Sequence, residues 1–141
     1  MSIKSERLTV WVEKMSLTGL LLATLFFAAS LTPSLIPRHF ALQGVLSGLS
    51  SAVGYGIGLL AERTWSYVQL PQPAGRLARR LKQGVGLVCL IVAVAFLWLA
   101  NGWQNSVRQA LDMPLVTSAN PFQVALIAFL TFCFLMAIGR L

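Results

Sequence analysis

Acidic residues are scarce in this 141-residue sequence, which has only 4 Asp+Glu, 1 His and 2 Cys. Charged residues of both signs make up 11% of the chain, whereas 57% of it is hydrophobic. An ordinary soluble domain has about 25% charged residues, so this chain has too few to cover a water-exposed surface. We therefore expect it to contact lipid.

The same shortages argue against most catalytic and metal chemistry. Neither cysteine has a CxxC or Cys/His spacing that would favour a metal ion. A serine hydrolase needs a GxSxG-type elbow with a histidine and an acid, but the serines near glycine lie in an apolar run and His39 has no carboxylate nearby. The GYGIG stretch, Gly54 to Gly58, lacks the lysine of a phosphate-binding loop. We expect no catalytic residue, cofactor or metal.

Four apolar segments approach the roughly 20 residues that a helix needs to cross a hydrocarbon core of about 30 Å. A cleavable signal peptide is not expected, because the first segment leads through prolines into a second full-length apolar run. The predicted fold is all-α, a single integral membrane domain over residues 1–141 built as a bundle of four transmembrane helices. We predict these helices at about residues 16–31, 40–61, 84–103 and 121–138.

Three further segments combine apolar residues at helical spacing with charges, so we predict amphipathic helices at the membrane surface. They cover about residues 3–15, 75–83 and 104–113. The second contains four cations, and each cation near an anionic leaflet contributes about 1 kcal/mol of attraction. The cations expected to contact anionic headgroups are Arg76, Arg79, Arg80 and Lys82.

The distribution of cations also predicts the orientation, because positive residues in short loops stay on the cytoplasmic side. Most of them lie in the N-terminal tail and in the connection between the second and third segments, whereas the other two connections hold Arg38 and Arg108. We therefore expect both termini in the cytoplasm. The cations do not form a continuous basic face, so nucleic acid is not an expected partner.

Small residues recur along one side of the second segment, and Leu49, Val53 and Ile57 gather on the other. Small residues let helix backbones approach closely in a membrane, so we predict one packing side and one lipid side. The alternative is that the glycines are merely tolerated there. The predicted packing residues are Gly44, Gly48, Ala52, Gly54, Gly56 and Gly58.

The stretch SLTPSLIPRHF, residues 30–40, separates the first two apolar segments. Two prolines disfavour continued helix, so they predict a tight turn that re-aims the chain. The cation and the histidine after them would lie at headgroup level. The residues of this predicted turn are Pro33, Pro37, Arg38 and His39.

SLTPSLIPR, residues 30–38, together with LQGVLSGLSSAVGYGIG, residues 42–58, resembles the N-terminal membrane domain of a family of bacterial α/β-hydrolase proteins. The stretch from Trp103 to Pro114 is similar to the segment after the third helix in that family. The resemblance implies a bacterial inner membrane and a hydrolase domain, carrying a serine nucleophile, after the membrane domain. Because this sequence stops at Leu141, we expect a stand-alone version, a truncated product or a fragment, and no catalytic residue carries over.

Two functions remain open from the sequence. The first is a multi-pass, non-enzymatic membrane module that anchors or positions an α/β-hydrolase domain, with the lipid bilayer and that domain as partners. Self-association through the small-residue ridges is also open. The second is a small stand-alone transport or lipid-handling subunit, which should have a polar-lined opening near Ser47, Ser51 and Tyr55.

Overall fold

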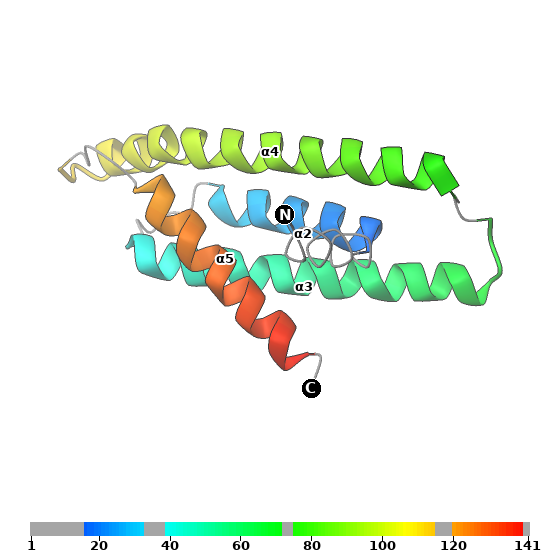
Figure 1. Cartoon of the computed structure of the whole chain (residues 1–141). Coiled ribbons are helices and arrows are strands. Elements are labelled where there is room, and N and C mark those ends of the chain that lie inside the picture. The colour runs from blue at the N-terminus through cyan, green and yellow to red at the C-terminus, as the bar shows by residue number, and fades with distance from the viewer. Residues whose placement is uncertain (1–15, 33–38, 72–74, 115–119, 140–141) are drawn as a thin grey trace, which may run out of the picture.

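The computed structural model describes residues 16–32, 39–71, 75–114 and 120–139, which form four α-helices and no strand. The all-α prediction is confirmed. Helices α3, α4 and α5 are long and apolar enough to cross a membrane, whereas α2 is a shorter apolar helix, so length and composition support three spans and the predicted fourth span stays a prediction. The helices are α2 (Leu17–Leu31), α3 (Phe40–Tyr67), α4 (Gly75–Ala110) and α5 (Pro121–Ile138) (Figure 1).

Helix α4 is much longer than the predicted third span. Its 36 residues extend for about 54 Å at 1.5 Å per residue. Residues 75–83 and most of 104–113, predicted as separate surface helices, instead continue the same helix, because no proline interrupts it before Pro114. The helix gives way to a turn in which Asp112 has a φ of 51°. Residues 3–15 lie outside the described part of the chain.

Local signals account for where three helices begin. The side chain of Ser16 caps α2, because its Oγ accepts a hydrogen bond from the Gly19 backbone N–H at 2.9 Å. His39 precedes α3, and its Nδ1 accepts from the Ala41 backbone N–H at 3.4 Å. Helix α5 begins at Pro121, a position where the missing N–H costs no helical hydrogen bond.

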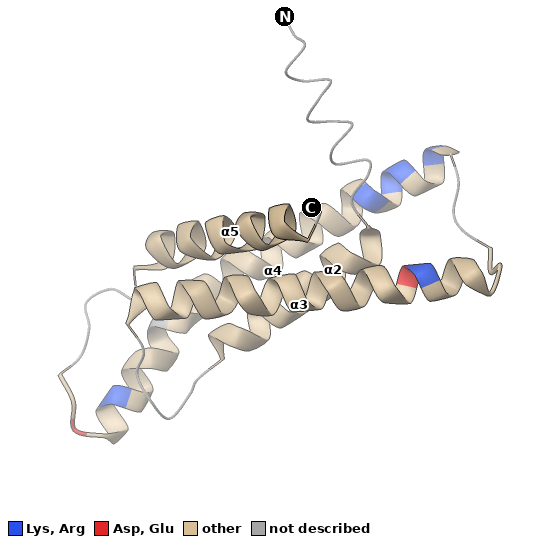
Figure 2. Ribbon diagram, turned by 90° about the horizontal axis from the view of Figure 1, so that it is seen from below, with Lys and Arg blue, Asp and Glu red and all other residues tan. Residues whose placement is uncertain are grey.

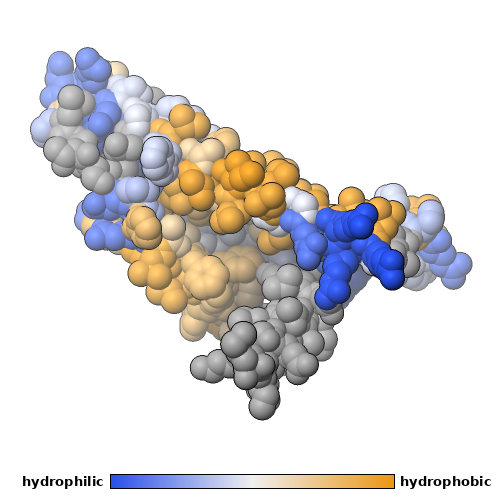
Figure 3. Space-filling view, turned by 45° about the horizontal axis from the view of Figure 1, so that its top comes forward, coloured by the Kyte–Doolittle hydropathy of each residue, from blue (hydrophilic) through white to orange (hydrophobic). Residues whose placement is uncertain are grey.

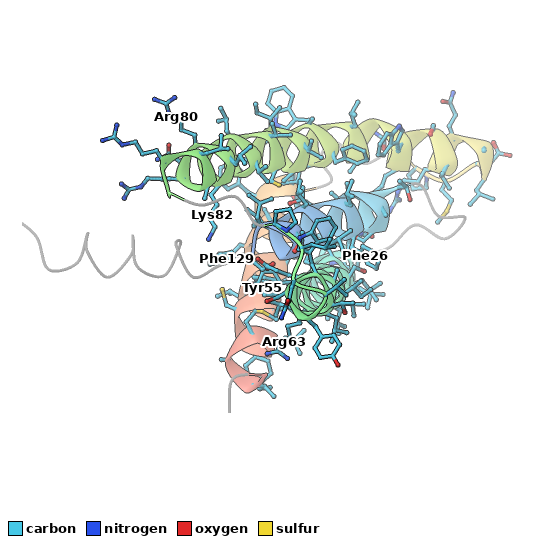
Figure 4. The ribbon with its side chains drawn as sticks, turned by 90° about the vertical axis from the view of Figure 1, so that its right-hand side faces the viewer. Phe26, Tyr55, Arg63, Arg80, Lys82 and Phe129 are labelled. Carbon is cyan, nitrogen blue, oxygen red and sulfur yellow. The ribbon has the colours of Figure 1, made fainter. Side chains whose placement is uncertain are left out.

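The helices form a row with the order α4, α2, α3, α5, in which the α2–α3 contact is the most extensive. Helix α4 packs on α2, and α5 packs on α3. In Figure 4, where α3 is seen nearly end-on, α4 runs across the top of the pair and α5 runs away from it below. Because α4 packs mainly on α2 and α5 mainly on α3, the other apolar sides of both helices are largely uncovered.

All four helices meet at one end of the molecule. Leu31 at the end of α2, Ala100 of α4 and Val124 of α5 form a buried cluster there. Phe27, Phe40, Phe96 and Leu97 pack against this cluster. All four helices are therefore in contact at the end where α2 finishes and α3 begins, while α4 and α5 diverge toward the opposite end (Figure 1).

Glycines on α3 allow close approach to two different neighbours. A Cβ on Gly54 would lie 2.5 Å from the Leu22 carbonyl oxygen of α2, and a Cβ on Gly48 would lie 2.6 Å from the Ala128 carbonyl oxygen of α5. Backbone atoms cannot yield as a flexible side chain can, so alanine fits at neither position. The two ends of the glycine-rich side thus serve two different interfaces.

The other predicted packing residues differ in how closely they approach a neighbouring helix. A Cβ on Gly44 would lie 2.7 Å from Ile127 of α5, and a Cβ on Gly58 would collide with Gly19 of α2. A Cβ on Gly56 would meet no atom within 4 Å, and Ala52 is half-buried. Gly56 therefore differs from the prediction, because the 100° step per residue turns it away from the side that Gly54 and Gly58 share.

The close approach of α2 and α3 can be tested with matched alanine variants at Gly58 and Gly56. Both changes raise the intrinsic helix propensity by the same amount. The difference between their free energies of unfolding therefore reports packing alone. We expect Gly58→Ala to lower the free energy of unfolding by about 1–3 kcal/mol, the usual cost of overpacking. Gly56→Ala should cause no loss. Thermal unfolding in detergent, followed by circular dichroism, measures both, and equal losses would contradict the packing assignment.

Candidate functional site

A buried polar cluster joins α2 to α3 near the end where all four helices meet. Gln43 Nε2 donates to the Ser30 carbonyl oxygen at 2.8 Å and to Ser47 Oγ at 3.2 Å. Ser30 Oγ lies 2.8 Å from Ser47 Oγ, and Ser51 Oγ donates to the Ser47 carbonyl oxygen at 2.7 Å. These bonds satisfy polar groups that would be costly to bury unpaired.

A second polar cluster ties the start of α2 to the middle of α3. The Tyr55 hydroxyl accepts from the Ser16 backbone N–H at 3.3 Å, and Thr18 Oγ1 donates to the Gly58 carbonyl oxygen at 3.0 Å. The Tyr55 ring also packs edge-on against Phe132 of α5, with centroids 5.9 Å apart. One tyrosine therefore contacts both neighbours of α3.

The residues expected to line a transport opening are instead buried between helices. Ser47 is 0% exposed, Tyr55 5% and Ser51 8%. Ser47 and Tyr55 are hydrogen bonded to Ser30 and Ser16 on the α2 side, and Ser51 Oγ donates to the Ser47 carbonyl oxygen within α3. The polar atoms of this part of the chain therefore hold helices together rather than face a water-filled passage.

The predicted lipid-contacting cations lie together on the first turns of α4. Arg76, Arg79 and Arg80 are exposed and Lys82 is half-buried. Figure 2 shows them at the end of the molecule that also carries Arg63 of α3. Arg80 and Lys82 project to different sides of the helix (Figure 4). This cluster can attract anions, and its side chains point in several directions.

Arg108 lies at the opposite end of α4, and it is bonded to the turn that follows the helix. Arg108 Nη1 donates to the Pro114 carbonyl oxygen at 3.2 Å, which fastens the turn after α4. Its Nε is buried and has no hydrogen-bond partner. Arg108 therefore belongs to the structure of the turn.

Residues of the predicted turn are only partly described. Pro33, Pro37 and Arg38 lie outside the described residues, so their predicted role stays a prediction. His39 is described, and it caps α3 with its ring 4.1 Å from the Phe40 ring, centroid to centroid. The histidine therefore has a local structural role at the start of a helix.

The cysteines do not pair. Cys89 is buried in α4 and Cys133 is exposed on α5, and both are free. Cys89 Sγ lies 3.9 Å from the Leu20 carbonyl oxygen, where α4 touches α2. Among the described residues there is no group of three His, Cys, Asp or Glu that could hold a metal ion.

Sequence reasoning did not find the hydrogen bonds that join α2 to α3. Gln43 could have indicated such a bond, because an amide in an apolar segment needs a hydrogen-bond partner. Its partner carbonyl at Ser30 lies at the end of another helix, and the sequence does not indicate that pairing. The hydrogen bond of the Tyr55 hydroxyl with Ser16 was missed because the sequence does not indicate that pairing either.

The described fold is that of an all-helical protein with three helices able to span a membrane. A family model described as the α/β-hydrolase family N-terminus matches residues 31–141, most of the chain. The chain therefore belongs to this family, and the predicted resemblance is confirmed. No curated protein and no solved structure matches it.

The buried cluster around Ser47 can be tested by removing one hydroxyl. We expect Ser47→Ala to lower the free energy of unfolding by about 1 kcal/mol, because it removes a partner of both Ser30 and Gln43. Ser50→Ala, the same change at a half-buried position on α3, should cost less than about 0.5 kcal/mol. Thermal unfolding in detergent compares the two, and an equal effect would count against the cluster.

Proposed function

We propose that this chain is a membrane-embedded module that anchors or positions an α/β-hydrolase domain at the cytoplasmic face of a bacterial inner membrane. The observation that carries the proposal is the family match over residues 31–141 in a chain with three helices able to span a membrane. In this proposal the catalytic residues belong to the hydrolase domain. The helices supply its attachment to the bilayer.

The surface of the molecule supports a location in lipid. Phe122 is 91% exposed and Trp98 is 78% exposed, in company with many leucines, valines and isoleucines on α4 and α5. Figure 3 shows a hydrophobic belt between hydrophilic ends. A soluble monomer rarely exposes so large a continuous apolar surface, whereas a bilayer covers it without cost.

The direction of the helices supports a cytoplasmic C-terminal end. Helices α4 and α5 run in opposite directions, so α5 runs back toward the side where α4 begins with its cations (Figure 2). Positive residues in short loops usually stay on the cytoplasmic side. If those cations do so, the chain after Ile138 leads into the cytoplasm. A hydrolase domain, fused or separate, would therefore meet the module on that face.

Packing favours the anchor over the alternative transport or lipid-handling subunit. The glycine-rich side of α3 is filled by α2 and α5, and the serines beside it are buried. The ridges considered for self-association, Gly44 with Gly48 and Gly54 with Gly58, are covered by helices of the same chain. A second copy could use them only by displacing α2 or α5.

The proposed orientation predicts which positions are reachable from each side. In a variant with Cys89 and Cys133 replaced by alanine, Ser106→Cys should react with a membrane-impermeant maleimide in intact spheroplasts. Ser66→Cys, equally exposed but beside the cationic end, should react only after permeabilisation. Reaction at Ser66→Cys alone would mean the opposite orientation, and the control is total labelling in detergent.

The anchoring role predicts that the module changes where a hydrolase domain is found. A soluble hydrolase domain from a family member, expressed as a separate chain, should shift from the soluble to the membrane fraction when this chain is co-expressed. An unrelated membrane protein of similar length serves as the control. Equal distribution with both partners would count against anchoring in trans.

A second arrangement tests anchoring within one chain. The same hydrolase domain fused after Leu141 should stay with membranes washed at high pH and remain protected from protease in intact spheroplasts. Digestion without permeabilisation would contradict a cytoplasmic attachment.

A further inference from the structure

A groove of about 350 Å³ lies between α2 and the N-terminal half of α4. Leu21 contributes one wall, and the other wall consists of α4 residues at helical spacing. The walls are almost entirely apolar. The α4 residues that matter for its chemistry are Leu77, Arg80, Leu81, Gly84 and Val88.

The groove lies where α4 runs alongside α2 and extends beyond its start (Figure 1). The two helices touch where Cys89 Sγ lies 3.9 Å from the Leu20 carbonyl oxygen. Toward the start of α4 they diverge (Figure 4). Gly84 widens the gap, because it has no side chain and a Cβ there would meet no atom within 4 Å.

The groove has one charged lining residue, near the start of α4. Arg80 lines it one turn after Leu77, and Val88 lies eight residues further along, a rise of about 12 Å. In Figure 4 Arg80 projects from α4 away from α2, so its stem can lie along the apolar wall while the guanidinium stands at the rim of the groove. The site therefore has the polarity of an amphiphile, with a cation at one end and an apolar slot behind it.

We propose that the groove holds one acyl chain of an anionic phospholipid whose phosphate is bound by Arg80. Charge complementarity identifies this occupant, because the groove opens beside four cations and a guanidinium donates two parallel hydrogen bonds to phosphate oxygens. The inference rests on the proposed location in a membrane. It goes beyond a general attraction to the leaflet, since it assigns one arginine and one groove.

Native mass spectrometry of the full chain in detergent tests this proposal with matched variants. Wild type should retain one phosphatidylglycerol more tightly than one phosphatidylcholine. Arg80→Gln should weaken phosphatidylglycerol retention about tenfold, whereas Arg79→Gln, with the same charge loss outside the groove, should weaken it less than about threefold. Gly84→Leu should fill the groove and weaken retention about tenfold. Gly86→Leu, on the same helix but not lining the groove, should have less than about a threefold effect.

Three results would overturn the proposal: equal losses for Arg80→Gln and Arg79→Gln, unchanged retention in Gly84→Leu, or displacement of the lipid by soluble glycerol 3-phosphate at the same concentration. The last would mean a phosphate site without an acyl chain. Unchanged retention in Gly84→Leu would mean that the acyl chain does not enter the groove. Thermal unfolding of each variant excludes a folding defect.

A separate measurement distinguishes failure of this site from failure of the membrane assignment. Membranes washed at high pH should retain wild type and all four variants equally. Loss of wild type in the wash would overturn the membrane location itself. Retention of all of them, with equal lipid binding, would overturn the groove and leave the proposed function intact.

Discussion

The structure depends on the contact between Gly19 of α2 and Gly58 of α3. A Cβ on Gly58 would collide with the Gly19 backbone, and a Cβ on Gly19 would meet the Tyr55 ring, so the two helices lie very close here. Thr18 Oγ1 then donates to the Gly58 carbonyl oxygen at 3.0 Å, a bond that a wider separation would break. Close contact of this kind stabilises helix pairs in lipid, where burial of apolar side chains brings little gain. Helix α3 then serves as the support for α5, and α2 as the support for α4.

Polar atoms inside this pair reinforce the same geometry. The Gln43 amide and the Tyr55 hydroxyl each reach across to backbone atoms of α2 or its start. In a medium without water, a shift of either helix would leave these groups without partners at a cost of about 1–3 kcal/mol each. The hydrogen bonds therefore define how α2 and α3 are aligned along their length, while the glycines define how close they lie. Neither cluster resembles a reaction centre.

The sequence predicted where the apolar helices occur, because a long apolar run is a strong signal for a helix. It also identified glycines that lie against backbone atoms, Gly48 and Gly54 among them. It could not assign those two glycines to different neighbours, since small residues do not specify a partner. Gly56 was included although its side of α3 is open, and the continuity of α4 was missed because charged ends resemble separate surface helices. The hydrogen bonds of Gln43 and Tyr55 depend on tertiary alignment, which periodicity does not encode.

In a membrane, the length of α2 would affect the surrounding bilayer. Its 15 residues extend for about 23 Å, less than a hydrocarbon core of about 30 Å. Ser16 caps one end and Thr32 the other, so the helix stops at both of these residues. In a membrane such a mismatch is relieved when lipids beside the short helix compress, at a cost of fractions of a kcal/mol per Å. The α2 side of the module would then sit in locally thinned bilayer, and the module would favour membranes, or regions of a membrane, that are thinner than average.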